Sequence, residues 1–593
     1  MIPEEILLKV NKPSQYLGNE INVAKKDFDN SYIRFALCFP DLYTVGMSNL
    51  GFRIIYGLLN SIEDVTCERV FLPEEDLIDF LEKERIGIFS WESKRNLKDF
   101  DMVGFSLSYE LTYTNILKIL DLADIPLYSS QRKNYPLIIG GGPCSINPEP
   151  LADFFDLFII GEAEEVILEI IDIYRQLKKK NSDKKPSKEE CLHNFKYLEG
   201  VYIPSFYDVS YHNDGTIKSF SSNVKDAPLP IKKQFLKNIE NSFYPKRWLL
   251  PYIEIVHDRL ILEIMRGCPN SCRFCQVRSF YYPYRIRSVD KLLALAKELF
   301  ISTGYEELSL GGLSVCDYPY IKELLEALNN EFKEKKLLVS LSSLRHKKLI
   351  GELISNFEIL KKGGLTFAPE TSSERLRKII NKEFDIEEFF SVVDKAYQKG
   401  FNHIKLYFMM GLPSEKNQDL DGIIEMAYRL YDFIKKKYKR TLRINLSINP
   451  FVPKPHTPFQ WLAMEDLEKI KEKEEYLFLK AKPYKWLKIS FHNRYMSFLE
   501  CLLSRADRRV SKVIYCAYKK GAVFKSLNSQ FSFDIWKSAF KEEKINPNFY
   551  VLRNLKKEEI LPWDFIDIGI FKELLWQEFE KIVRELGELG KVR

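Results

Sequence analysis

The sequence predicts an α/β protein with a Rossmann-like doubly wound domain, then a (β/α)6 partial barrel, then a smaller mixed or helical C-terminal domain. Residues 32–176 alternate short β-branched or aromatic runs with helical periods, as a doubly wound parallel sheet does. From residue 259, strand-like and helical segments again alternate regularly, which is typical of a barrel or partial barrel. This alternation fades beyond residue 481, where we expect the smaller domain.

The first alternation predicts the elements of the N-terminal domain. Short apolar runs mark its strands, and apolar residues at spacings of three and four mark its helices. We expect strands at 33–39, 65–70, 102–106, 137–139 and 157–160. We expect helices at 48–59, 111–123 and 164–176.

The second alternation predicts six strand and helix units. We expect strands at 260–265, 307–310, 338–341, 365–368, 403–408 and 442–448. We expect helices at 289–300, 321–332, 348–356, 374–380 with 386–399, and 422–436. A functional site should lie at the carboxyl ends of these strands.

Composition changes predict the domain boundaries. Residues 177–190 are dominated by Lys, Glu, Ser and Asp around a proline, as in a solvated connection. We therefore expect a Rossmann-like domain over 1–176, a linker and accessory region over 177–250, a barrel over 251–480 and a basic C-terminal domain over 481–593.

The overall composition is that of a folded globular protein. Hydrophobic residues make up 45 % of the 593 residues and charged residues 29 %, which excludes extended disorder. Glu4 and Glu5 stand where a secretory signal carries positive charge, and no apolar run is long enough to span a bilayer. The ten cysteines are scattered apart from one cluster, which argues against a secreted disulfide framework. We expect a cytoplasmic protein that does not enter a membrane.

The cysteine cluster is the most specific motif in the chain. Cys268, Cys272 and Cys275 form a CxxxCxxC pattern directly after the first expected barrel strand. A structural zinc site normally has four ligands, and no second cysteine pair exists here to complete one. Three thiolates on a [4Fe-4S] cluster would leave one iron open to a substrate or cofactor. The alternative is three buried or zinc-binding cysteines.

This motif, with Phe274 before its last cysteine, resembles the radical S-adenosylmethionine superfamily. The resemblance implies that the open iron chelates the amino and carboxylate groups of S-adenosylmethionine. In that family an electron from the reduced cluster splits the cofactor into methionine and a 5′-deoxyadenosyl radical. The protein supplies orientation and excludes water. The electron would come from a donor such as flavodoxin or ferredoxin.

Three further strand ends resemble the methylthiotransferase-like branch of this superfamily. Gly311 and Gly312 match the glycine turn that meets the methionyl amino group. Glu370 matches a contact to the cofactor ribose or carboxylate, and Met410 and Gly411 match the adenine pocket. The alternatives are an ordinary turn at the glycines, a helix cap after Glu370, and a methionine that only fills the core.

The N-terminal domain has no GxGxxG phosphate loop, which disfavours a dinucleotide. It resembles instead the cobalamin-binding domain that often precedes a radical barrel, with its DxHxxG loop, a later serine and a glycine turn. The residues matched are Asp41, Tyr43, Gly46, Ser106, Gly140 and Gly141. Tyr43 stands at the histidine position, so cobalamin would bind without a lower histidine ligand from this loop, or would not bind.

The resemblance covers residues 30–480. The glycine-rich run 140–150 and the later segment 161–165 are similar to cobalamin-type radical proteins of uncertain substrate. Relatives end in a further cysteine-rich tail, which this sequence does not show.

The region 481–525 is strongly basic, with eleven Lys or Arg against two Asp or Glu. Basic residues interleaved with aromatic ones can grip phosphates and stack bases, so RNA is one candidate substrate. A solvated basic face is the alternative, and it could also steer a protein substrate or an electron donor.

The sequence leaves three functional hypotheses. The first is a cobalamin-dependent radical enzyme that transfers a methyl group to a macromolecule, either RNA or protein. The second is a radical enzyme that binds no cobalamin and performs another modification. The third is a metal-bearing RNA-binding protein without catalytic activity. No catalytic acid or base is identifiable.

Overall fold

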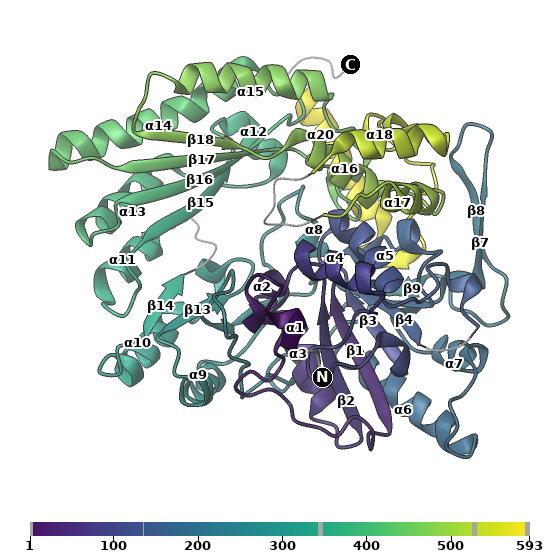
Figure 1. Ribbon diagram of the computed structural model, residues 1–593. Coiled ribbons are helices and arrows are strands. Elements are labelled where there is room, and N and C mark those ends of the chain that lie inside the picture. Colours follow the sequence, from purple (N-terminus) through teal and green to yellow (C-terminus); the bar gives the residue numbers. More distant parts are fainter. Residues whose placement is uncertain (1–3, 134–135, 342–347, 525–530, 588–593) are drawn as a thin grey trace. The chain divides into compact units, whose positions relative to one another are not determined.

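The computed structural model describes residues 4–133, 136–341, 348–524 and 531–587 (Figure 1). The chain forms two compact units, and each collects segments that lie far apart in the sequence. The first unit contains residues 1–258, 503–547 and 558–569. The second unit contains residues 259–502, 548–557 and 570–593.

A six-stranded sheet forms the centre of the first unit, in the order β2-β1-β3-β4-β5-β6. Neighbouring strands are parallel, except that β6 runs antiparallel to β5. The strands are β1 (Ile33–Phe39), β2 (Val65–Phe71), β3 (Met102–Ser106), β4 (Leu137–Gly141), β5 (Leu157–Ile159) and β6 (Val201–Tyr202). The order 2-1-3-4-5 is that of a doubly wound fold whose direction switches between β1 and β3, where such folds bind ligands. The predicted doubly wound domain is confirmed.

Helices connect these strands. They are α1 (Glu4–Leu7), α2 (Tyr43–Gly46), α3 (Leu50–Asn60), α4 (Glu75–Glu84), α5 (Tyr113–Leu122), α6 (Val166–Lys180) and α7 (Lys188–Phe195). The sequence determines where α3 begins, because Asn49 caps the helix. Its side chain accepts a hydrogen bond of 2.9 Å from the Phe52 amide. Ile54 and Leu58 are buried on the apolar face of α3, which packs against β1 and β2.

The first unit also includes segments from the expected linker and the C-terminal region. The hairpin of β7 (Tyr207–Tyr211) and β8 (Ile217–Ser222) follows β6, and β9 (Ile231–Lys232) pairs in parallel with β19 (Ile566–Asp567). Of the C-terminal helices before β19, α17 (Val510–Lys519) and α18 (Phe533–Glu542) belong to this unit, whereas α16 (Arg494–Arg505) and α19 (Pro547–Val551) lie mostly in the second unit. Helix α17 packs against α5 and α18.

Parallel strands alternate with helices through the second unit. One sheet has the order β10-β13-β14 and another has the order β15-β16-β17-β18. The strands are β10 (Leu260–Glu263), β13 (Glu307–Gly311), β14 (Leu338–Leu341), β15 (Gly364–Glu370), β16 (His403–Met410), β17 (Arg443–Pro450) and β18 (Leu487–Phe491). The six strands expected from the sequence are all present, and β18 adds a seventh to them.

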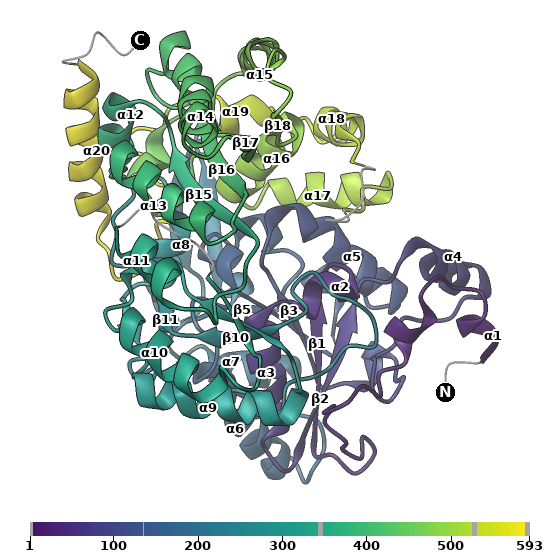
Figure 2. The same ribbon diagram turned by 90° about the vertical axis from the view of Figure 1, so that its left-hand side faces the viewer.

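The helices of the second unit lie close to their expected ranges. They are α8 (Gln276–Phe280), α9 (Val289–Thr303), α10 (Ile321–Phe332), α11 (Lys348–Asn356), α12 (Glu374–Ile380), α13 (Ile386–Gln398), α14 (Asn417–Tyr438), α15 (Leu467–Ala481) and α20 (Lys572–Gly587). Helix α20 lies beside α12 in both views (Figures 1 and 2).

The two units differ from the four consecutive segments that we predicted. Residues 177–250 belong to the first unit because β6 extends its sheet. Residues 481–593 are shared between the units, because β18 extends the sheet of β17 while β19 pairs with β9. Local composition carries no signal for such long-range pairing.

Candidate active site

The three clustered cysteines lie on one loop of the second unit. The loop follows the short strand β11 (Met265–Arg266), and Cys275 directly precedes α8. The antiparallel partner of β11, β12 (Arg285–Ile286), comes after α8. Gly267 opens the loop with a φ of 82°, and a Cβ there would lie 2.8 Å from the carbonyl oxygens of Tyr281 and Pro283. The loop therefore needs glycine at this position.

The three sulfurs are not arranged as a compact single-ion site. Tetrahedral zinc with bonds of about 2.3 Å needs sulfurs roughly 3.8 Å apart. In the described part of the chain, the sulfurs of Cys268, Cys272 and Cys275 do not all lie within 4.8 Å of one another. All three are half-buried. Three thiolates on one loop are the donor set that a [4Fe-4S] cluster with one open iron uses.

The thiols influence one another. Burial raises the pKa of Cys275, the backbone amide of Arg278 lowers it, and the neighbouring sulfurs of Cys272 and Cys268 raise it further. Bound iron would remove this repulsion and release the protons.

Arg273, inside the cysteine loop, ties the loop to two helices. Its amide donates a hydrogen bond of 3.0 Å to the carbonyl of Ile380 at the end of α12, and its guanidinium donates to the carbonyl of Lys378 at 3.2 Å. The same guanidinium pairs with Glu578 and Glu585 of α20, at 3.4 and 3.1 Å. Its side chain is only 8 % exposed. The loop is thereby fixed at both helices.

Asn270 contacts one of the cluster thiols. Its amide nitrogen lies 3.4 Å from Cys268 Sγ and donates to Asp317 Oδ2 at 2.6 Å. Ser314 donates to the same carboxylate oxygen at 2.6 Å. A donor aimed at a ligating sulfur stabilises its negative charge and tunes the attached metal.

Glu370, the expected cofactor contact, is the last residue of β15. Its φ is 65°, and its carboxylate pairs with Lys382 Nζ at 2.7 Å. Both side chains are 14 % exposed. The Lys382 ammonium lies 5.9 Å from the ring centroid of Phe274, and its charge works against burial in setting the pKa of Cys275. The structure thus brings Glu370 and the cysteine loop together through Lys382.

The two expected glycines stand where β13 meets its neighbours. A Cβ at Gly311 would lie 2.9 Å from Ile261 Cγ2, and one at Gly312 would lie 2.7 Å from Met265 Cγ. Strand packing alone therefore favours glycine at both positions. Their contact with a cofactor stays a prediction.

Part of the expected adenine pocket lies in the hydrophobic core. Met410 is fully buried at the end of β16, whereas Met409 is half-buried and packs with Phe274 on a hydrophobic cluster. That cluster includes residues of α12 and α20. Gly411 has a φ of 80°, and its amide donates to Glu415 at 2.8 Å. Met409 and Phe274 of the cysteine loop therefore pack against the same hydrophobic cluster.

The structure also shows residues at this site that the motifs did not identify. Asn270 and Arg273 lie within the CxxxCxxC spacing, so a closer reading of the loop could have found them. Lys382 follows α12, and nothing in the local sequence pairs it with Glu370.

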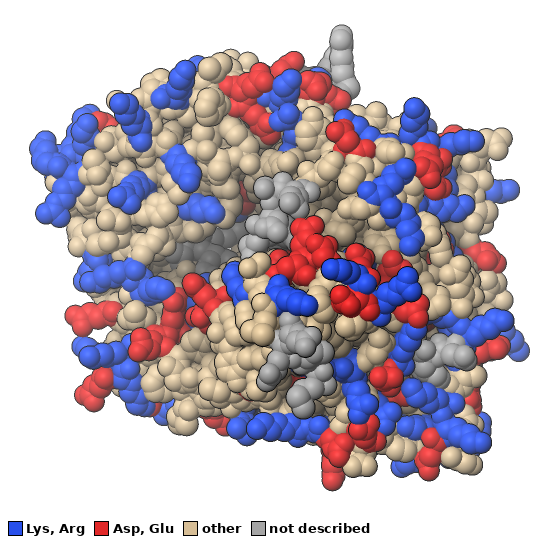
Figure 3. Space-filling view, viewed as in Figure 1, with Lys and Arg blue, Asp and Glu red and all other residues tan. Residues whose placement is uncertain are grey.

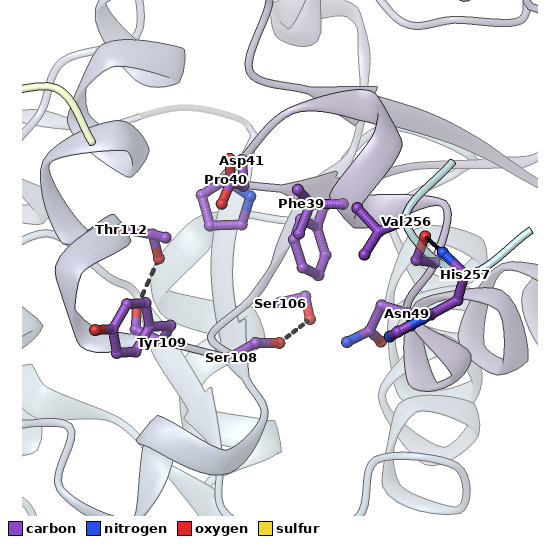
Figure 4. Close-up of a pocket in the computed structure, with 12 residues that line it drawn as sticks. Phe39, Pro40, Asp41, Asn49, Ser106, Ser108, Tyr109, Thr112, Val256 and His257 are labelled. Atoms are coloured by element: carbon purple, nitrogen blue, oxygen red, sulfur yellow. Dashed lines mark hydrogen bonds between the residues drawn. The ribbon is translucent and has the colours of Figure 1, made fainter. Parts of the chain in front are cut away.

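A second candidate site is a cavity of about 250 Å³ in the first unit. It lies at the carboxyl ends of β1 and β3, which is the switch point of the sheet (Figure 4). Two expected cobalamin residues line it, Asp41 and Ser106. The remaining lining residues are Phe39, Pro40, Val45, Ser48, Asn49, Ser108, Tyr109, Thr112, Val256 and His257.

The other expected cobalamin residues do not line this cavity. Tyr43 is 2 % exposed and its hydroxyl donates to Glu20 Oε1 at 2.8 Å. A Cβ at Gly46 would lie 2.4 Å from the Phe71 ring, and one at Gly140 would lie 2.7 Å from the Phe158 ring. These positions serve packing within the unit. A Cβ at Gly141 would meet no atom closer than 3.7 Å. The Gly141 carbonyl accepts a hydrogen bond of 2.7 Å from the Leu107 amide.

The run after Gly141 anchors the C-terminal segment of the same unit. Asn147 donates to the carbonyls of Ser504 and Ala506 at 2.9 and 3.0 Å. Arg508 pairs with buried Glu149 at 3.2 Å. This motif therefore has a structural role.

The basic region 481–525 is partly neutralised by its contacts. Lys525 lies outside the described residues. Of the others, Arg494, Arg508 and Lys520 pair with Glu474, Glu149 and Glu542, at 2.6, 3.2 and 2.8 Å. Figure 3 shows acidic and basic side chains interspersed on the visible face. The local excess of positive charge is therefore smaller in the fold than in the sequence.

Known proteins match both units. Residues 262–427 match the radical SAM superfamily, and residues 51–204 match the N-terminal region of radical SAM proteins. An uncharacterized protein of Methanocaldococcus jannaschii is 28 % identical over 518 residues, which is 86 % of this chain and 98 % of that protein. A tRNA-2-methylthio-N(6)-dimethylallyladenosine synthase of Pelagibacter ubique is 26 % identical over 32 % of this chain and 45 % of its own length.

Other relatives share only part of the chain. The ribosomal protein uS12 methylthiotransferase of a Thermoanaerobacter species is 25 % identical over 30 % of this chain and 40 % of its own length. Among solved structures, the radical S-adenosylmethionine methyltransferase TsrM of Kitasatospora setae has a TM-score of 0.46 at 12 % identity. That alignment covers 72 % of this chain and 74 % of TsrM.

Within the described residues, no helix has both the length and the apolar character needed to cross a bilayer. The expected cofactors of the cysteine loop agree with the family match, because radical S-adenosylmethionine enzymes use a [4Fe-4S] cluster and S-adenosylmethionine. The half-buried cysteine loop and the two matched regions agree in identifying the chain as an enzyme of the radical S-adenosylmethionine superfamily.

Proposed function

We propose that this enzyme transfers a methyl group to a macromolecule and that cobalamin binds at the carboxyl edge of the first unit's sheet. The observation that carries the proposal is the cavity at the switch point between β1 and β3, with Asp41 and Ser106 in its wall. Relatives that act on tRNA and on a ribosomal protein support a macromolecular substrate of one of these two kinds.

The lining residues fit part of a corrinoid. The cavity combines the apolar walls of Phe39, Pro40 and Val45 with hydroxyl, amide and carboxylate groups, the mixture that a ligand rich in amide groups needs. Asp41 is only 1 % exposed, and its Oδ1 accepts a hydrogen bond of 2.7 Å from the Leu42 amide, which fixes the carboxylate. Tyr43 is turned into the interior and takes no part.

In the second unit, Cys268, Cys272 and Cys275 would hold the cluster. When bound, the cluster and S-adenosylmethionine supply reductive cleavage that yields a hydrogen-abstracting radical. Arg273 holds the loop against α12 and α20. The ion pair of Glu370 and Lys382 places one charge of each sign beside the loop, which suits a cofactor that carries both signs.

The enzyme needs a reductant, and we propose flavodoxin or ferredoxin for this role. None of the ten cysteines, all of which lie in the described part of the chain, forms a disulfide, which supports a reducing, cytoplasmic location. A second candidate function is a radical modification without cobalamin. The burial of Tyr43 favours it, because this loop then offers cobalt no ligand.

Anaerobic reconstitution with iron, sulfide and cobalamin tests the proposal. We expect about four irons per chain, bound corrinoid, and 5′-deoxyadenosine after reduction. Cys268→Ala should lose iron and cleavage, whereas Cys67→Ala, a thiol in β2, should keep both. Cleavage without corrinoid binding would support the second candidate function. Zinc in place of iron would overturn the cluster assignment.

A further inference from the structure

The loop after β1 does not supply the imidazole that cobalamin-binding domains with a DxHxxG loop carry at this position. Its residue 43 is a tyrosine whose hydroxyl donates to Glu20 in the interior. Any protein imidazole that reaches a corrinoid in the cavity would therefore come from another part of the chain.

A strap formed by residues 250–258 supplies an imidazole to the same cavity. The Val256 amide donates to the Thr44 carbonyl at 3.3 Å, and the His257 amide donates to Ser48 Oγ at 2.9 Å. The beginning of the strap is held too, because the Leu250 amide donates to the Ile21 carbonyl at 3.1 Å. The strap is therefore fastened to the segment that follows β1, next to residue 43.

His257 is the one histidine among the 12 residues that line the cavity (Figure 4). His257 is exposed, so an incoming ligand can reach this residue. Imidazole is a favoured ligand of divalent transition metals, and it binds in its neutral form near physiological pH. Of the other lining groups, Asn49 offers an amide and the remainder offer oxygen or apolar surface.

We propose that His257 is the lower axial ligand of cobalt in this enzyme and replaces the imidazole absent at position 43. The inference rests on the proposed function, because it requires a corrinoid in the first unit. The strap thus restores, from a segment more than 200 residues downstream, the donor type that the loop lacks.

The test uses cobinamide, a corrinoid without its own nucleotide base, so that any axial nitrogen comes from the protein. The full chain is loaded with cob(II)inamide, and its electron paramagnetic resonance spectrum is recorded. We expect each cobalt line to split into three through one ¹⁴N nucleus. Labelling the histidines with ¹⁵N should change this to a splitting into two.

The matched variants are His257→Gln and His212→Gln, because His212 is an exposed histidine of the same unit on the β7–β8 turn. His257→Gln should lose the nitrogen splitting and bind cobinamide about tenfold more weakly or worse, since even indirect partners of a metal ligand affect affinity by that factor. His212→Gln should behave as wild type. A circular dichroism spectrum equal to that of the wild type would show that His257→Gln is folded.

The outcomes separate this inference from the proposed function. Cobinamide that binds without nitrogen splitting overturns the role of His257 and leaves cobalamin dependence standing. Splitting that persists in His257→Gln also overturns it. Failure of wild type to bind cobinamide or cobalamin overturns both.

Discussion

The Tyr43 hydroxyl donates a hydrogen bond of 2.8 Å to Glu20 Oε1, deep in the first unit. Glu20 also pairs with Arg69 at 2.7 Å, and the two side chains are 1 % and 0 % exposed. Burial acts to raise the pKa of Glu20, but Arg69 and the hydrogen bonds outweigh it and hold that pKa below its ordinary value. Tyr43 thus belongs to a buried ionic network.

Tyr43→Phe should therefore destabilise the first unit without changing corrinoid binding. Removing one donor to a buried carboxylate costs about 1–3 kcal/mol. Urea unfolding monitored by circular dichroism should show the loss, and titration with cobalamin should give the wild-type affinity. A changed cobalt spectrum in this variant would mean that Tyr43 does reach the ligand.

The contrast between Tyr43 and His257 shows where sequence reasoning succeeds and fails. The strands and helices were predictable because each carries its own periodicity, and the cysteine loop was predictable because its spacing is local. The strap has no such signal, since its contact with Thr44 joins residues more than 200 positions apart. The charge count of the basic region overstated its positive charge for the same reason, because Arg508 pairs with Glu149, which is distant in the sequence.

A second prediction concerns Asp156, which precedes β5. Its carboxylate pairs with Arg132 at 3.0 Å and with Lys188 at 2.5 Å, and it accepts from the Ile138 amide at 2.7 Å. Asp156→Asn leaves two cations without their counter-ion and should cost about 3–5 kcal/mol in unfolding free energy. Asp534→Asn, at an exposed pair with Lys537, should change it by less than about 0.5 kcal/mol.

The same residue predicts a pH dependence. Burial acts to raise the pKa of Asp156, but Arg132 and Lys188 outweigh it and hold the pKa below its ordinary value. A carboxylate with a lowered pKa stabilises the fold above its unfolded pKa of about 4, and this stability is lost as the pH falls through the folded value. Wild type should lose stability on acidification below about pH 4, and Asp156→Asn should show a shallower loss. Equal slopes would contradict this assignment.

A third prediction concerns the anchoring of the cysteine loop. Arg273→Leu removes the contacts to Lys378, Glu578 and Glu585, each a charge-assisted or capping hydrogen bond. We expect a cluster that reconstitutes with less iron per chain and degrades faster in air. Arg584→Leu, an exposed arginine on α20, should retain wild-type iron content. Full iron loading in Arg273→Leu would show that the cysteines alone order the loop.

The last prediction concerns the charge of Lys382 beside the cluster. Reduction adds a negative charge to the cluster, and a nearby ammonium stabilises that charge. Lys382→Gln should lower the midpoint potential by tens of millivolts, which corresponds to an interaction on the order of 1 kcal/mol in a partly hydrated site. Glu370→Gln should shift the potential in the opposite direction, because it removes the carboxylate paired with the same ammonium. Lys378→Gln is the matched control, since that side chain is 73 % exposed and pairs with Glu374 instead. Redox titration followed by electron paramagnetic resonance measures all three variants, and equal potentials for Lys382→Gln and Lys378→Gln would show that the Lys382 ammonium does not act on the cluster.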